Sequence, residues 1–327
     1  MRQLWINGKF EPGGGRPVYS IDPATEEIIG EAGWGDLADA ERAVKAAHST
    51  FPERRRLPGA ERSGLLHEIA HRLRGNLEDI ATELTLETGR SIRKNRGYVE
   101  WSAQCFDYYA ELARHYRGRV IPSPESSQLS LVLKVPLGVV AAIVPWNYPL
   151  LLLAWKLAPA LAAGNTVVVK PASCTSWVSL GFARLFEHLP PGVVNILTGA
   201  GSQVGEHLVT HPQVRMIAFT GSTEVGQRIM RLAAEDVKHV HLELGGKDPL
   251  IVCADADLEA AARASVWGGF LNAGQVCTSV ERVYVEKEVY SPFLERAVEL
   301  VRQLVVGPGI DGKRSHTHDT SQRASKS

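Results

Sequence analysis

Residues 166–171 read TVVVKP, a short run of β-branched residues that a lysine and a proline close. Such a run is typical of a buried strand. Three similar runs follow: Val193–Leu197, Met216–Thr220 and His239–Leu244. The segments between them, at about 176–188, 203–210 and 223–234, have the apolar spacing of helices. This alternation predicts an α/β fold with a doubly wound parallel sheet, which binds its ligand at the carboxyl ends of the strands.

A second, smaller α/β pattern follows Gly246. It predicts strands at Leu250–Val252 and Val283–Glu286 and helices near 257–271 and 290–304.

The part of the chain before residue 166 has a different pattern. Apolar residues from Leu65 to Leu84 recur at helical spacing and predict a helix that closes near Gly89, and a second helical run covers about 98–116. Further on, Leu129–Val135 and Gly138–Val144 predict two strands across a break at Pro136.

Composition excludes several classes of protein. Thirty-six basic and thirty-six acidic residues cancel in a chain of 327, so we expect neither nucleic acid nor a membrane as a partner. The longest apolar stretch, Leu150–Ala163, contains Lys156 and is too short to span a bilayer. No signal peptide is recognisable, and the four cysteines have no metal or disulfide spacing. We therefore expect a reduced cytoplasmic protein without a metal.

Cys277 and Glu243 are the candidate chemical groups. Cys277 follows the polar, loop-like sequence NAGQV, so we interpret it as a nucleophile, whereas we interpret Cys105, Cys174 and Cys253 as small buried side chains. Glu243 ends an apolar strand beside two glycines, where burial would raise the pKa of a general base.

Five sequence blocks in order resemble those of the aldehyde dehydrogenase superfamily: PWNYP at 145–149, VKP at 169–171, FTGS at 219–222, LELGGK at 242–247 and GQVCT at 274–278. The resemblance implies oxidation of an aldehyde to a carboxylic acid with NAD or NADP, through a thiohemiacetal and a thioester on Cys277. It assigns deacylation to Glu243 and stabilisation of the oxyanion to Asn147.

The same resemblance implies a set of cofactor-binding residues: Trp146, Lys170, Ser173, Gly201, Phe219, Gly221, Ser222, Val225 and Leu244. Lys170 ends a strand, so we expect its ammonium group to project at the sheet edge. The loop at 221–226 joins a strand to a helix and would offer free N–H groups to a pyrophosphate. Ser173 stands where many NAD-preferring relatives have a glutamate, and the choice between NAD and NADP stays open.

The expected domains are a Rossmann-like coenzyme domain (1–124 and 145–246), a β-strand arm for oligomerisation (125–144), an incomplete catalytic domain (247–311) and a disordered tail (312–327). The resemblance ends near Asp311, and we expect truncation or a frameshift there. A family-length form would be a homodimer or homotetramer. Two alternatives are a truncated, non-catalytic dinucleotide-binding fragment and a cysteine esterase that needs no cofactor.

Overall fold

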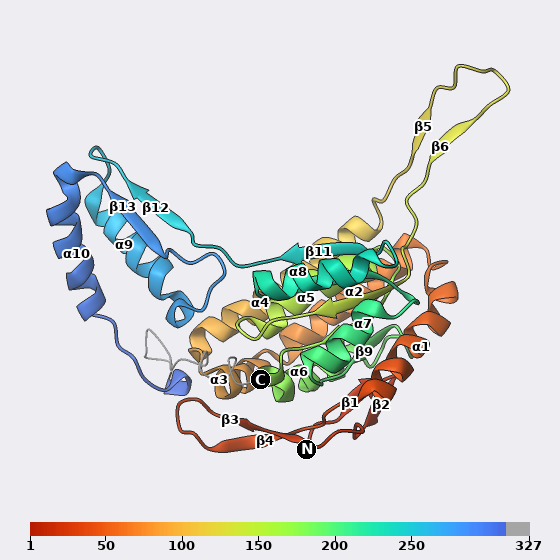
Figure 1. The fold of residues 1–327 in the computed structure, drawn as a ribbon, viewed down its shortest axis with the longest axis horizontal. Helices are drawn as coiled ribbons and strands as arrows, with labels where there is room; N and C mark the ends of the chain where they lie inside the picture. The colour runs from red at the N-terminus through yellow and green to blue at the C-terminus, as the bar shows by residue number, and fades with distance from the viewer. Residues whose placement is uncertain (312–327) are drawn as a thin grey trace.

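A seven-stranded sheet forms the centre of the larger of two units, in a computed structural model that describes residues 1–311 (Figure 1). The strand order is β11-β10-β7-β8-β9-β1-β2. The bounds are β11 His239–Glu243, β10 Val214–Thr220, β7 Val139–Ile143, β8 Thr166–Lys170, β9 Val194–Ile196, β1 Leu4–Ile6 and β2 Lys9–Glu11.

The five strands from β11 to β9 are parallel, and β1 and β2 at the opposite edge pair antiparallel. Along the chain the strands step from β7 through β8 to β9 in one direction, and then from β10 to β11 in the other. The direction therefore reverses between β7 and β10. This reversal confirms the doubly wound fold and marks where such sheets bind ligands.

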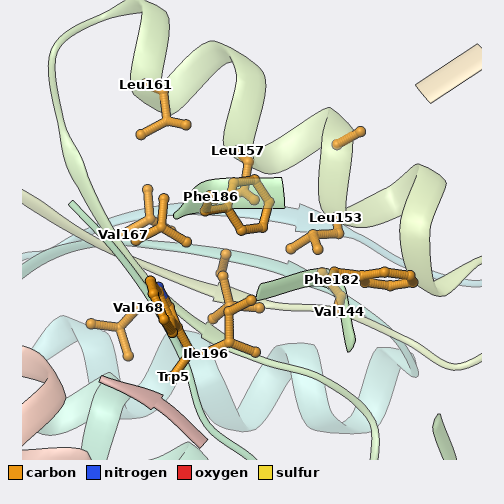
Figure 2. Packing of buried hydrophobic residues seen from close by; sticks show 14 of the residues in the cluster. Trp5, Val144, Leu153, Leu157, Leu161, Val167, Val168, Phe182, Phe186 and Ile196 are labelled. Carbon is orange, nitrogen blue, oxygen red and sulfur yellow. The ribbon is translucent and has the colours of Figure 1, made fainter. Parts of the chain in front are cut away.

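Helices cover both faces of this sheet. On one side α5 (Pro149–Ala162) packs with α2 (Gly59–Gly75) and α4 (Ile92–Ala113), while α1 (Leu37–Arg54), α7 (Glu206–Thr210) and α8 (Thr223–Ala234) form a second group. Figure 2 shows Leu153, Leu157 and Leu161 of α5 facing the sheet, where they join its valines in one buried core. The remaining segments of this unit are α3 Leu77–Thr88, α6 Ser176–Gly181, β3 Val18–Ile21 and β4 Ile28–Ala32, with short helical turns at Ser173–Thr175, Phe182–Phe186 and Gly201–Gly205.

Three predictions for the larger unit are wrong. The strands β1 to β4 precede the first helix, where only helices were expected. The helix expected to run to Gly89 is broken at Asn76 into α2 and α3, although Gly89 does end α3 in a left-handed conformation (φ 71°). Finally, β11 is not buried: it is the edge strand, so only alternate side chains are covered.

The smaller unit consists of the parallel strands β12 (Pro249–Val252) and β13 (Arg282–Val285) with helices α9 (Leu258–Phe270) and α10 (Tyr290–Arg302). Short turns lie at Leu271–Gly274, Lys287–Val289 and Gly309–Asp311. Its own small core contains Val252, Ala262 and Phe293. All four predicted elements are present, within one or two residues of the expected bounds.

A thin arm projects from the larger unit, away from the smaller one (Figure 1). It consists of β5 (Arg119–Ile121) and β6 (Ser130–Val132), which pair antiparallel. The two strands predicted across Pro136 are present but do not form one pair, because β6 pairs upstream with β5 and β7 is a central strand of the main sheet. No helix within residues 1–311 is long and apolar enough to cross a membrane. The predicted disordered tail lies outside the described residues.

Candidate active site

Cys277 and Glu243 line the same cavity, although they belong to different units. The cavity has a volume of about 830 Å³ and lies against α4, α5 and the ends of β10 and β11. Aromatic side chains form much of its wall: Trp101, Tyr108, Tyr109 and Trp155. A thiol and a carboxylate that face one apolar cavity supply a nucleophile and a base to a single bound molecule. The structure therefore brings together the two groups that the sequence singled out.

Glu243 is the last residue of β11, opposite Thr220 in β10. Its carbonyl accepts a hydrogen bond from the N–H of Gly221 at 3.1 Å. This N–H group was expected to be free for a pyrophosphate, and that expectation is wrong. The expected burial is also wrong: 62% of the Glu243 side chain is exposed, and its carboxylate lies 3.3 Å from Nε2 of His241. Glu243 is exposed because β11 is the edge strand, so a neighbouring strand lies on only one side of this residue.

Asn147 follows β7 and contacts the loop that carries Cys277. Its Nδ2 donates to the carbonyl of Gln275 at 3.0 Å, two residues before the thiol. Its Oδ1 is buried and has no hydrogen-bond partner among the described residues. An amide nitrogen has two hydrogens, so one remains for another acceptor near Cys277. This geometry is compatible with the oxyanion-binding role that the resemblance implies.

Arg90 and Asn272 hold these two loops together, and sequence reasoning missed both. The buried Arg90 donates from Nε to Oδ1 of Asn272 at 2.9 Å and from a terminal nitrogen to the carbonyl of Asn147. Asn272 in turn donates to the carbonyl of Gln275 at 3.2 Å. Asn272, Ala273 and Gly274 all have left-handed backbones (φ 52°, 56° and 79°). Such strained turns persist where surrounding contacts hold them, and here they present Cys277.

Lys156 is a second charged residue that becomes notable only in the structure. It interrupts the apolar face of α5, is buried, and donates from Nζ to the hydroxyl of Thr220. Burial lowers its pKa to about 8, against the opposing effect of the nearby Glu243 charge. A lysine within an otherwise apolar helical stretch was the only sequence signal for this group.

The loops after β8 and β9 meet at the carboxyl edge of the sheet. Lys170 ends β8, but its side chain does not project: it is buried, and Nζ donates to the carbonyl of Pro171 at 3.1 Å. Burial lowers its pKa to about 8. The glycine turn at 201–205 passes beside it, since a Cβ at Gly205 would lie 3.5 Å from the Lys170 chain. Ser173 lies in the next turn, and Gly201 is exposed with open space beside it.

The loop after β10 requires glycine for a steric reason. A Cβ at Gly221 would lie 2.4 Å from the buried ring of Phe219. Ser222 directly precedes α8, and its hydroxyl accepts from the N–H of Val225 at 3.3 Å, as a helix N-cap does. The Val225 side chain is exposed. This helix start offers the positive end of its dipole at the switch point of the sheet.

The other two predicted cofactor residues lie on neighbouring segments. Leu244 packs against α8 at Gly226, where a Cβ would lie 2.6 Å from the leucine. Trp146 is partly buried in the loop after β7, beside Asn147. The loops after β7, β8, β9, β10 and β11 thus all contribute to one edge of the sheet.

The other cysteines are only partly as expected. Cys105 and Cys174 are partly buried, but Cys253 is exposed and its interpretation as a buried side chain is wrong.

One cluster has the composition of a metal site. Glu41, His207 and His211 place their ligand atoms within 4.8 Å of one another. However, Nδ1 of His211 accepts the N–H of Gln213 at 3.1 Å, so the proton of the neutral ring lies on Nε2, 3.0 Å from Glu41. Burial also lowers the pKa of His211. A hydrogen bond therefore accounts for its contact with Glu41, and the expected lack of a metal stays a prediction.

Comparison with known proteins agrees with this site. The sequence profile of the aldehyde dehydrogenase family matches residues 10–325. The chain is 42% identical to retinaldehyde dehydrogenase 3 of Rattus norvegicus over 98% of its length, and 42% identical to betaine aldehyde dehydrogenase 1 of Oryza sativa over 95%. It spans 64% of the length of each of these relatives.

Solved structures agree as well. The betaine aldehyde dehydrogenase of Staphylococcus aureus in complex with NAD+ superposes with a TM-score of 0.95 at 34% identity, covering 98% of this chain and 65% of that one. An NADP-dependent enzyme of E. coli superposes with a TM-score of 0.94 at 35% identity, covering 97% and 66%. The chain therefore belongs to the aldehyde dehydrogenase family. Because the match reaches residue 325, the expectation that the resemblance ends near Asp311 is wrong.

Proposed function

We propose that this protein oxidises an aldehyde to a carboxylic acid with NAD or NADP. The observation that carries the proposal is the shared cavity: the thiol of Cys277 and the carboxylate of Glu243 line it together, at the switch point of a doubly wound sheet. Its aromatic wall suits the body of a free, uncharged aldehyde.

Each proposed catalytic residue has one task. The Cys277 thiolate adds to the aldehyde carbon and forms a thiohemiacetal, while the free hydrogen of the Asn147 amide stabilises the oxyanion. The thiohemiacetal carbon would then give a hydride to a bound NAD or NADP, which would leave a thioester on Cys277. Glu243 then takes a proton from water, and the resulting hydroxide attacks the thioester and releases the acid. The exposure of Glu243 leaves water free access to this base.

We infer that the dinucleotide lies along the carboxyl edge of the sheet. The start of α8 after β10 supports this proposal, because the positive end of its helix dipole lies at the switch point of the sheet and favours a pyrophosphate. The residues proposed to hold the cofactor are Trp146, Lys170, Ser173, Gly201, Phe219, Gly221, Ser222, Val225 and Leu244.

The arm suggests how copies associate. Its apolar side chains Val120, Leu131, Leu133 and Val135 are all at least half exposed, which is typical of a surface that another chain covers. We propose a homodimer or homotetramer for a family-length form, and the domain division given above. A thiol nucleophile functions only while reduced, so we propose a cytoplasmic location.

The test compares two cysteine variants of the same purified chain. Cys277→Ser should abolish aldehyde-dependent formation of NAD(P)H while the affinity for dinucleotide stays unchanged, because a serine alkoxide is far harder to form at neutral pH. Cys253→Ser, an exposed thiol in the same unit, is the matched control and should keep full activity. Retained turnover in Cys277→Ser would refute the assignment.

The same samples separate the alternatives. A non-catalytic fragment would bind dinucleotide and show no turnover with any aldehyde in the unmodified chain. An esterase would hydrolyse an activated ester without cofactor and would not reduce NAD or NADP.

A further inference from the structure

A second cavity, of about 470 Å³, lies between the beginning of α4 and the helices of the smaller unit. Among the residues that the structure describes, it shares no lining residue with the cavity of Cys277. One wall is basic, with Arg90, Arg93 and Lys94, and the opposite wall is largely apolar. None of the lining residues within 1–311 is acidic. The lining residues in the described part of the chain are Arg90, Ser91, Arg93, Lys94, Tyr98, Arg263, Val266, Trp267, Leu271, Asn272, Leu300, Gln303 and Leu304.

Arg90 is a buried cation without a carboxylate partner among residues 1–311. Only 4% of it is exposed, and its acceptors are the amide oxygens of Asn272 and Asn95 and one backbone carbonyl. Its guanidinium also lies over the rings of Tyr98 and Tyr148. Burial lowers its pKa to about 10. Its contacts are all with neutral groups, so an anion in this cavity would stabilise the guanidinium charge.

Ser91 supplies a second, independent observation. It precedes α4, is 2% exposed, and its hydroxyl has no hydrogen-bond partner among the described residues. The N–H groups of Ile92 and Arg93 begin the 22-residue helix α4 beside it, whereas those of Lys94 and Asn95 donate to the Ser91 carbonyl at 2.9 and 3.0 Å. An unpaired buried hydroxyl at the positive end of a helix is a ready contact for an anion.

The exposed charges of this wall are also unpaired. Arg93 and Lys94 have no ion pair within the described part of the chain, whereas Arg263 pairs with Glu259. Trp267, Leu271 and Leu304 face them across the cavity as an apolar surface. We propose that this cavity binds a small organic anion, with its phosphate or carboxylate group at the start of α4 and an aromatic or aliphatic body against Trp267. The inference does not depend on the proposed dehydrogenase activity.

Three probes test this proposal on the full chain: phenyl phosphate, benzoate and inorganic phosphate. The indole N–H signal of Trp267, assigned with Trp267→Phe, reports binding by NMR, and the signals of Trp101 and Trp155 report the cavity of Cys277. We expect saturable movement of the Trp267 signal alone with an organic probe. The tighter of phenyl phosphate and benzoate identifies the anionic group, and inorganic phosphate should bind more weakly than phenyl phosphate.

Variants locate the binding. Arg93→Gln with Lys94→Gln should weaken the affinity for the organic probe about tenfold or more, since two charges are lost. Ser91→Ala should weaken it about fivefold, as expected for one hydrogen bond. The matched control is Arg114→Gln, which removes an exposed charge at the other end of α4 and should leave the affinity unchanged.

Three results would overturn the proposal. The first is the lack of saturation at about 10 mM probe, well above a millimolar Kd. The second is movement of Trp101 or Trp155 in place of Trp267. The third is equal weakening in the Arg114 control. Equally tight binding of inorganic phosphate would overturn the role of the apolar wall.

Discussion

Replacing Lys156 with methionine tests whether the buried ammonium group beside the candidate active site destabilises the fold. Burial lowers the pKa of this lysine from 10.5 to about 8, which corresponds to roughly 3 kcal/mol at neutral pH. Methionine has a similar volume and no charge, but it loses the hydrogen bond to Thr220, worth about 1 kcal/mol. We therefore expect Lys156→Met to be about 2 kcal/mol more stable than the unmodified protein at pH 7.

The stability difference between Lys156→Met and the unmodified protein should decrease as the pH rises. Below pH 8 the lysine is charged in both folded and unfolded chains, so the full destabilisation is present. Between pH 8 and 10.5 the folded protein loses the proton that the unfolded chain still holds, so stability rises with pH. The advantage of the variant should fall from about 2 kcal/mol at pH 7 to near zero at pH 10.

Urea unfolding of both proteins at pH 7 and pH 10 measures this change. Lys170, whose pKa burial also lowers to about 8, is present in both proteins and cancels in the difference. A stability difference that is the same at both pH values would refute the reasoning, because it would show that the charge of Lys156 is not the destabilising feature.

Three further predictions concern other positions. Burial raises the pKa of Glu87 to about 7. As the pH rises from 4.5 to 7, the protein should therefore lose roughly 3 kcal/mol of stability relative to Glu87→Gln, measured by urea unfolding. Parallel pH profiles of the two proteins would contradict this. Asn147→Ala should lower kcat about 10²–10³-fold, and a change confined to KM would point to a binding role instead. Ser173→Glu should shift the ratio of kcat/KM about tenfold toward NAD by repelling a 2′-phosphate, and an unchanged ratio would mean that Ser173 does not face the ribose.

The sequence predicted those features of the fold that depend on residues near one another in the chain. The valine run at 167–169 forms part of a buried parallel strand, because a strand covered on both faces needs apolar residues at successive positions. The same reasoning failed for β11, whose place at the sheet edge depends on strand order and not on its own residues. The sequence pattern also did not predict which strands pair, since β6 pairs with the short upstream strand β5 and not with β7, the next strand along the chain.

The sequence likewise predicted some residues of the candidate site and not others. Cys277, Glu243 and Asn147 were recognisable from their motifs, and the structure places the first two in one cavity and the third against the cysteine loop. Arg90 was not recognisable, because its role consists entirely of contacts with residues far away in the chain. The direction of the Lys170 side chain was likewise decided by packing that the strand pattern does not contain.

Arg90 also stands where the two units meet. The chain leaves the larger unit through the exposed glycines 245 and 246 and returns at Gly309, which packs against the backbone of Gly89 and Arg90. A proteolytic cut between those glycines would therefore divide the chain into two fragments that still contact each other. One fragment would contain Asn147 and Glu243, and the other would contain Cys277. The proposed turnover would then require the two fragments to associate, and its dependence on their concentration would report how strongly the contacts at Arg90 hold them together.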